Sequence, residues 1–172
     1  MKISTGLYKI AKKLKRVDSA GIFLPLPKHI AKFFPKKKED SSPPHVTILY
    51  LGGVLKSDKD AYKKVLEVAL EKTSKLGKVF LDDLAFFKNQ DNQWIAHNPI
   101  RCEGLGDLRK RIWKACEILG LEIQDSFPKF KPHATLAYLD QKKYDKEVFV
   151  GSFNPTHFEI WGFDQKISVP IK

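Results

Sequence analysis

The sequence has few cysteines and no long apolar run. Its two cysteines, Cys102 and Cys116, cannot make a disulfide framework, and no Cys-x-x-Cys or Cys–His cluster indicates a zinc site. No apolar stretch approaches the roughly 20 residues of a membrane-spanning helix. Basic residues recur through Arg16 and interrupt any hydrophobic region of a signal peptide. We therefore expect a protein of the reducing cytoplasm, with no membrane partner.

The chain has 172 residues, of which 42% are apolar and 12% aromatic, enough for one domain with a core. Its net charge of +11 is unevenly placed, because residues 1–40 carry 11 Lys and Arg against 3 Asp and Glu. Such basic runs are ordinary solvated surface or a face that attracts polyanions such as nucleic acid. The charge alone does not decide between these alternatives.

The first 18 residues form a basic segment with a narrow apolar stripe. Its apolar residues are spaced by four, three, four and three positions: Ile3, Leu7, Ile10, Leu14 and Val17. This spacing predicts an amphipathic helix over residues 1–18, docked on a single domain of residues 19–172. A membrane-surface or oligomer-forming helix is less well supported, because the stripe lacks aromatic anchors.

The rest of the chain alternates irregularly between strand and helix patterns. We expect strands at residues 20–27, 45–51, 79–87, 94–100 and 133–139, and one or two more within 153–171. Helices are expected at 58–76, with Ser57 as N-cap and Gly77 as the stop, and at 105–119, ended by Gly120. This order is typical of an α+β fold with antiparallel sheets.

Two segments of the chain repeat each other. Residues 44–51 read PHVTILYL and residues 132–139 read PHATLAYL, with five of eight positions identical. A chance recurrence of His-x-Thr in this composition has odds of roughly one in a hundred, before the shared Pro, Tyr and Leu are counted. The repeat therefore indicates a duplicated functional element.

The spacing of the repeat places its polar side chains together. Alternate side chains of a strand share a face, so His45 and Thr47 project together, as do His133 and Thr135. A single such His is most often a core histidine bonded to nearby backbone. The duplication favours one cleft lined by two imidazoles, of which one accepts a proton while the other donates one. In-line displacement at phosphorus requires that arrangement.

These segments resemble the two signature strands of the 2H phosphoesterase superfamily, which includes the bacterial RNA 2′,5′-ligase/cyclic phosphodiesterase group. Further segments resemble the family's opening strand, the helix before its second motif, the lead into that motif and its closing strand pair: residues 23–27, 105–119, 130–132 and 158–168. The resemblance covers about residues 20–170 and leaves out the N-terminal helix.

The resemblance implies a bilobal α+β fold, with two pseudo-symmetric lobes of antiparallel sheet and flanking helices around a central cleft. His45 and His133 would be the acid–base pair, and Thr47 and Thr135 would hydrogen-bond the phosphate oxygens. The repeat leaves open which His is the base. No metal and no cofactor are expected, the substrate would be a nucleotide or RNA-type phosphodiester, and the protein would be a monomer.

Five further residues are candidates for substrate binding. Phe130 and Lys131 precede the second motif and could stack on a base and contact phosphate, although a core Phe and a solvated Lys fit equally well. Phe23, Tyr50 and Tyr138 complete the set. Strand alternation places both tyrosines on the face opposite the threonines, which favours core packing unless the strands bulge.

Other polar and aromatic residues carry less signal. Three histidines lack the motif and are interpreted as surface or structural: His29, His97 and His157. Three tryptophans are interpreted as core: Trp94, Trp113 and Trp161.

Two functions are compatible with these patterns. The favoured one is a metal-independent phosphodiesterase for a 2′,3′-cyclic phosphate, a 2′,5′-linkage or a cyclic nucleotide. The alternative is a non-catalytic RNA-binding module that uses the same cleft and the basic N-terminus. Both histidines and both threonines are present, which favours the enzyme.

Overall fold

The computed structural model describes residues 15–36, 42–73, 75–125 and 129–172. The described strands are β1 (Ala20–Pro25), β2 (His45–Gly52), β3 (Val79–Leu81), β4 (Ala85–Lys88), β5 (Trp94–Arg101), β6 (His133–Leu139), β7 (Gly151–Phe153), β8 (His157–Trp161) and β9 (Ile167–Pro170). The described helices are α2 (Lys28–Ala31), the 3₁₀ turn η1 (Lys56–Asp58), α3 (Lys59–Lys72) and α4 (Leu105–Leu119).

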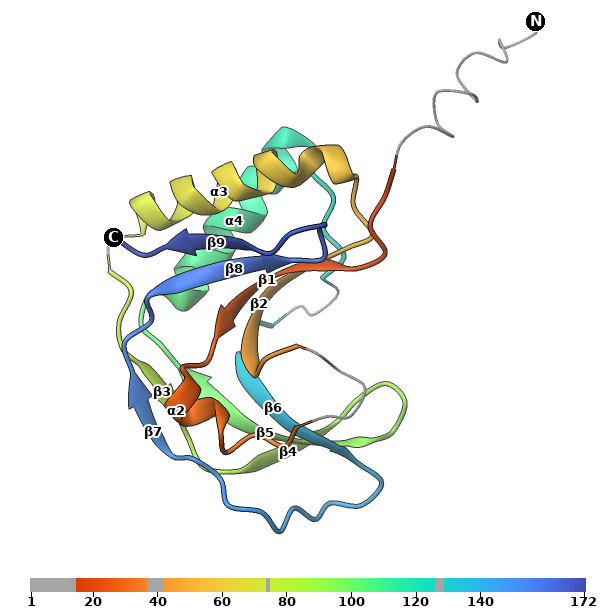
Figure 1. The fold of residues 1–172 in the computed structure, drawn as a ribbon, viewed down its shortest axis with the longest axis vertical. Helices are drawn as coiled ribbons and strands as arrows, with labels where there is room; N and C mark the ends of the chain where they lie inside the picture. Colours follow the sequence, from red (N-terminus) through yellow and green to blue (C-terminus); the bar gives the residue numbers. More distant parts are fainter. Residues whose placement is uncertain (1–14, 37–41, 74, 126–128) are drawn as a thin grey trace, which may run out of the picture.

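All nine strands belong to one antiparallel sheet in the order β7-β3-β5-β6-β2-β1-β8-β9, with β4 also paired to β5. The sheet curls strongly, so that β1, β2, β8 and β9 form one half and β3 to β7 form the other (Figure 1). The two halves join where β2 meets β6 through the pair Val46 and Ala134. The α+β class and the bilobal arrangement predicted from the sequence are thereby confirmed.

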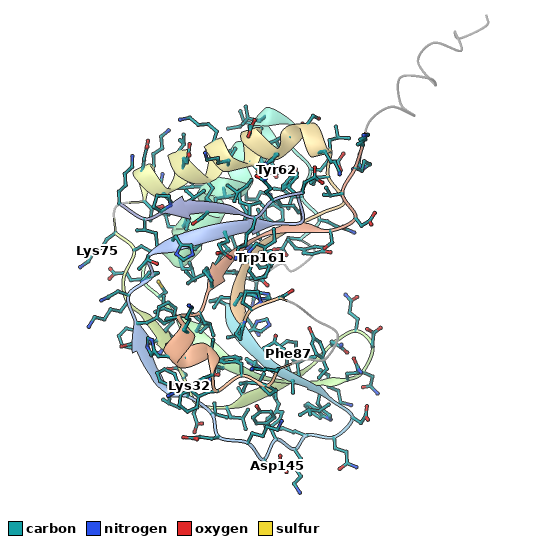
Figure 2. The ribbon with its side chains drawn as sticks, viewed as in Figure 1. Lys32, Tyr62, Lys75, Phe87, Asp145 and Trp161 are labelled. Atoms are coloured by element: carbon teal, nitrogen blue, oxygen red, sulfur yellow. The ribbon has the colours of Figure 1, made fainter. Side chains whose placement is uncertain are left out.

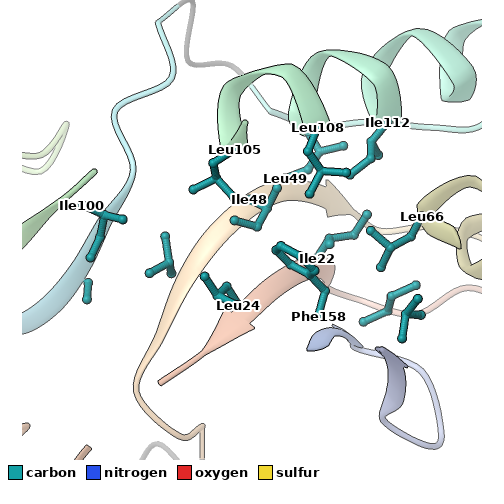
Figure 3. Packing of buried hydrophobic residues seen from close by; sticks show 14 of the residues in the cluster. Ile22, Leu24, Ile48, Leu49, Leu66, Ile100, Leu105, Leu108, Ile112 and Phe158 are labelled. Carbon is teal, nitrogen blue, oxygen red and sulfur yellow. The ribbon is translucent and has the colours of Figure 1, made fainter. Parts of the chain in front are cut away.

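Helices α3 and α4 pack against each other over the half that contains β1, β2, β8 and β9 (Figure 1). Figure 3 shows Leu105, Leu108 and Ile112 of α4 facing the bend of β2, with Ile22 of β1 and Phe158 of β8 beneath them. Each of these side chains is at most 1% exposed. Burial of one such side chain stabilises the fold by about 1.5–3 kcal/mol, so this contact fixes β2 against α4.

Helix α4 has the predicted bounds, whereas α3 is shorter than predicted. Gly120 ends α4 at φ 68°, a left-handed conformation that glycine adopts without strain. Helix α3 follows η1 and ends before Thr73, whose hydroxyl donates to the Ala69 carbonyl at 2.8 Å. Ser57 lies within η1 and is not the N-cap, and Gly77 lies beyond the helix, before β3. None of the described helices is long and apolar enough to cross a bilayer.

The strand predicted at 79–87 is divided into β3 and β4. Pro99 of β5 lacks an N–H to donate to this edge, and the Asp82 N–H donates to the Pro99 carbonyl at 2.9 Å. The Asp82 carboxylate turns outward to Arg101, at 2.8 Å, and Asp83 caps its neighbour's N–H. The short helix α2, within a Lys- and Pro-rich segment, was not predicted.

Most of the predicted N-terminal helix lies outside the described residues. Its last part is extended, because Arg16 forms an isolated β-bridge with Leu55 and the Val17 N–H donates to the Val54 carbonyl at 2.9 Å. The Arg16 guanidinium also bonds the Gly53 carbonyl and the Glu122 carboxylate. The prediction of a helix is therefore wrong for residues 15–18, and residues 1–14 lie outside the described residues.

Candidate active site

The four motif residues lie where the two halves of the sheet join. Val46 pairs with Ala134, and continuing that antiparallel register sets His45 opposite Thr135, and Thr47 opposite His133. Val46 and Ala134 are fully buried on one face, so their polar neighbours project from the other. In this register the two histidines lie on a diagonal, about 7–8 Å apart in an ordinary sheet.

All four motif residues line one cleft of about 1710 Å³. Tyr50, Phe130, Lys131 and Tyr138, four of the five predicted substrate-binding residues, also line it. Phe23, the fifth, is not among the residues that line the cleft; its ring lies against that of His45, at 4.8 Å between centroids. Other basic and aromatic residues of the lining include Lys28, Lys32, Lys36, Phe86, Phe87 and Lys129.

The two motif imidazoles are oriented by the same kind of bond. Nδ1 of His45 lies 2.8 Å from the Pro43 carbonyl oxygen, and Nδ1 of His133 lies 3.0 Å from that of Lys131. A carbonyl oxygen only accepts, so each Nδ1 carries the proton and donates it. In the neutral form of each ring, Nε2 is then the nitrogen without a proton.

His45 sits against a wall of two aromatic rings. Phe23 and Trp161 stack on each other at 4.3 Å between centroids, and each meets the His45 ring edge-on. The Trp161 indole N–H donates to the buried carboxylate of Glu159 at 2.7 Å, and Lys166 contacts the same carboxylate at 3.1 Å. Trp161, predicted as core, is therefore half-buried and supports a motif histidine.

Glu159 remains charged although it is buried. Burial by itself raises the pKa of the Glu159 carboxyl, but the hydrogen bonds from Trp161, Lys166 and His157 together outweigh it and hold that pKa below its usual range. A fixed negative charge thus stands behind the aromatic wall of His45.

His133 has a different wall, made of Phe87 and His97. The His133 ring lies 5.2 Å from that of Phe87 and 5.3 Å from that of His97, both edge-on. His97 is 9% exposed, and burial, followed by the charge of His133, lowers its pKa. The interpretation of His97 as a surface or structural residue missed its position in the cleft. His29 is exposed, and His157 bonds Glu159 at 3.3 Å. Neither residue is among those that line the described cleft.

The interpretation of Tyr50 and Tyr138 as core residues is wrong. They are 39% and 54% exposed and line the cleft. The register of β2 on β1 shifts between Thr47 and Leu49, and that of β6 on β5 shifts between Thr135 and Ala137. Each shift is a bulge that inserts one residue and reverses the alternation, which turns the tyrosine to the side of its threonine.

Arg109 of α4 is a residue of the site that was not predicted from the sequence. Its Nε donates to the carbonyl of Ile48, the inserted residue of the β2 bulge, at 3.1 Å, and its guanidinium forms a buried ion pair with Asp125 at 2.9 Å. The same guanidinium lies 5.0 Å from the Phe130 ring centroid. Arg109 therefore ties the lead into the second motif to the strand of the first. An arginine on an amphipathic helix gives no sequence signal of such contacts.

The described part of the chain holds no cluster of three or more His, Cys, Asp or Glu side chains placed to bind a metal ion. Two imidazoles can take up and release protons, and two threonine hydroxyls can donate hydrogen bonds to an anion between them.

Comparisons with known proteins place the fold among known ones. Solved structures of similar fold include TT0787 of Thermus thermophilus (TM-score 0.64, 17% identity, covering 90% of this chain and 95% of that one). They also include E. coli LigT complexed with 3′-AMP (0.57, 19%, 91% and 96%) and the MHV ns2 PDE domain (0.51, 15%, 90% and 99%). At these identities the likeness shows the fold.

A comparison with curated proteins gave no match. The family model of the 2′-5′ RNA ligase superfamily matches residues 22–150, a range that contains both His-x-Thr segments. The chain therefore belongs to the 2′-5′ RNA ligase superfamily, a family of 2H phosphoesterases.

Proposed function

We propose that the protein is a metal-independent phosphodiesterase for a nucleotide or RNA-type substrate carrying a 2′,3′-cyclic phosphate, a 2′,5′-linkage or a cyclic phosphodiester. One observation carries the proposal: two imidazoles, each fixed through Nδ1 to a backbone carbonyl, line one cleft together with Thr47 and Thr135. His45 and His133 are the acid–base pair, and Thr47 and Thr135 bind the phosphate.

On a 2′,3′-cyclic phosphate, the neutral imidazole accepts a proton through Nε2 from the water that attacks phosphorus. The bond between phosphorus and one ring oxygen breaks, and the protonated imidazole gives its proton to that oxygen. The products are a phosphate monoester and a free sugar hydroxyl. The Thr47 and Thr135 hydroxyls donate to the phosphate oxygens on which charge grows. The pair then exchanges its proton with solvent and is ready for the next turnover.

The lining of the cleft supports a nucleotide as substrate. Lys28, Lys32, Lys129 and Lys131 bring positive charge to the lining, which attracts phosphates. Phe86, Phe87 and Phe130 offer aromatic surface on which bases stack. The fold neighbour LigT was solved with 3′-AMP, a nucleotide with a phosphate on the ribose, which agrees with this class.

The test is turnover of a substrate panel in EDTA: nucleoside 2′,3′-cyclic phosphates, 2′,5′-linked dinucleotides and cyclic dinucleotides. The wild-type protein should hydrolyse at least one class at a rate that EDTA does not change. The His45→Ala/His133→Ala double variant should lose that activity, whereas the exposed control His29→Ala should keep it. Turnover that requires Mg²⁺, or survives in the double variant, would contradict the proposal. Tight RNA binding without turnover would favour the non-catalytic module.

A further inference from the structure

The two halves of the sheet place the same backbone around each motif. In the first half, Phe23 pairs with Thr47 and Pro25 pairs with His45. In the second half, His97 pairs with Thr135, and Pro99 pairs with His133. A register shift immediately precedes Phe23 in β1 and His97 in β5. His97 therefore occupies the position that Phe23 occupies in the other half.

The neighbouring rings extend this correspondence. Trp161 pairs with Gly21, two residues before Phe23, and Phe87 pairs with Ile95, two residues before His97. Each forms a three-ring cluster with its half's motif histidine, and Figure 2 shows Trp161 and Phe87 on opposite halves of the sheet. The first cluster has the phenyl ring of Phe23 where the second has the imidazole of His97.

His97 is oriented in the same way as the two motif histidines. Its Nδ1 donates to the carbonyl of Ile95, two residues earlier, at 3.3 Å. The motif histidines use the carbonyls of Pro43 and Lys131, also two residues earlier. Within the described ranges, no protein group is bonded to Nε2 of His97, and the side chain lines the cleft.

The protonation of His97 decides what it can bind. Burial and the charge of His133 lower its pKa, so the ring is neutral near pH 7. With its proton on Nδ1, Nε2 is a hydrogen-bond acceptor. A phosphate oxygen without a proton is also only an acceptor and cannot bond to it, whereas a hydroxyl can.

We propose that His97 is a substrate-binding residue whose Nε2 accepts a hydrogen bond from the sugar hydroxyl next to the phosphate held by His133 and Thr135. The inference rests on the proposed function. Because the two rings lie 5.3 Å apart, the ligand groups that they bind must be neighbours in the ligand. The 2′ and 3′ oxygens of ribose, one carrying phosphate and one free, form such a pair. Phe23 cannot accept this bond, so only the second half would recognise the hydroxyl.

The test is calorimetric binding of product-like nucleotides that differ in one hydroxyl. Uridine 3′-monophosphate is compared with 2′-deoxyuridine 3′-monophosphate, and uridine 2′-monophosphate with its 3′-deoxy analogue. For at least one pair, the wild-type protein should bind the ribonucleotide about five- to tenfold more tightly than the deoxy analogue. His97→Phe, which keeps a ring in the cluster, should bind both members of that pair equally.

Two further variants separate binding from structure. His97→Gln has an amide carbonyl that can accept the same bond, so it should retain part of the preference. The exposed His29→Phe should retain all of it, and His97→Leu replaces His97→Phe if the phenyl variant does not fold. A wild-type protein with no preference, or a preference unchanged in His97→Phe, would overturn the inference. If one of these two binding results is found and the wild-type protein still hydrolyses a panel substrate, the proposed function stands and only the inference about His97 fails. A protein that binds no nucleotide and hydrolyses no panel substrate would overturn both.

Discussion

The two halves of the sheet surround the same backbone motif with different side chains. In the first half, His45 lies against Phe23 and Trp161, and the charged Glu159 stands behind them. In the second half, His133 lies against Phe87 and a further imidazole, that of His97. The duplicated strands thus hold the two motif imidazoles in the same way, whereas the side chains packed against them differ.

Register and bulges are shared by the two halves and set the spacing of the imidazoles and hydroxyls. On our proposal, these shared features serve the reaction itself. The side chain two residues before the paired proline differs between the halves, Phe23 in one and His97 in the other. On our proposal, this difference decides which half accepts the sugar hydroxyl.

Removal of one motif imidazole tests whether the halves contribute equally to the reaction. His45→Ala and His133→Ala should each lower kcat/KM about 10²–10⁴-fold, the usual contribution of one acid–base group. The double variant should lose much less than the product of the two, because the groups act as a unit. Steady-state kinetics on the substrate found in the panel measures this. A single variant with wild-type turnover would show that its half supplies no such group.

The threonines test the same symmetry with a smaller expected effect. Thr47→Ala and Thr135→Ala should each lower kcat about 10–10³-fold, because each removes one donor to the charged phosphate. Thr→Ser variants keep the hydroxyl and should recover most of the rate. Equal losses at the two positions would extend the symmetry to the phosphate, and a loss at neither would exclude the hydroxyls from the transition state.

The carboxylate behind His45 should make the first half sensitive to acid. The pKa of Glu159 is lowered in the folded protein, so its ionised form stabilises the fold above the ordinary pKa of about 4.3, and this contribution is lost as the pH falls through the lowered value. Glu159→Gln should be less stable than wild type at pH 7, and the difference should shrink toward pH 3. Urea unfolding from pH 7 to pH 3 measures the difference in the free energy of unfolding between the two proteins. A difference that does not change with pH would contradict a lowered pKa of Glu159.

His97 should give the second half a smaller sensitivity, nearer neutral pH. Its pKa is lowered in the folded protein, so as the pH falls below about 6.5 the unfolded chain takes up the proton first and the fold loses stability. Between pH 7 and pH 5 the wild-type protein should therefore lose more stability than His97→Phe. Parallel urea-unfolding curves for the two proteins would show that His97 is not buried as a neutral ring.

The sequence was sufficient for the features that depend on neighbouring residues. Helix α4 and strand β6 have their predicted bounds, since apolar spacing, Gly120 and the repeat are local signals. The sequence did not predict the orientation of Tyr50 and Tyr138, because a bulge is a property of the register between two strands.

Contacts between distant segments account for the remaining differences. His97 reaches the cleft because β5 pairs with β6, and Arg109 reaches Ile48 because α4 packs on β2. Neither residue belongs to a repeated motif. A weak signal does exist for His97, since a proline follows it two positions later, as Pro25 follows Phe23. This signal can be interpreted only when the strand register is known, because the register pairs each proline with a motif histidine.

The pH dependence of kcat/KM for the wild-type protein and the two single histidine variants tests the central claim most directly. If one half supplies the base and the other the acid, the wild-type profile is a bell whose two limbs belong to the pair. Loss of the base should remove the acidic limb, and loss of the acid should remove the basic limb, so the two variants keep opposite limbs and reveal which half has which role. A bell that persists in both variants, or a wild-type rate that does not vary with pH, would contradict the account.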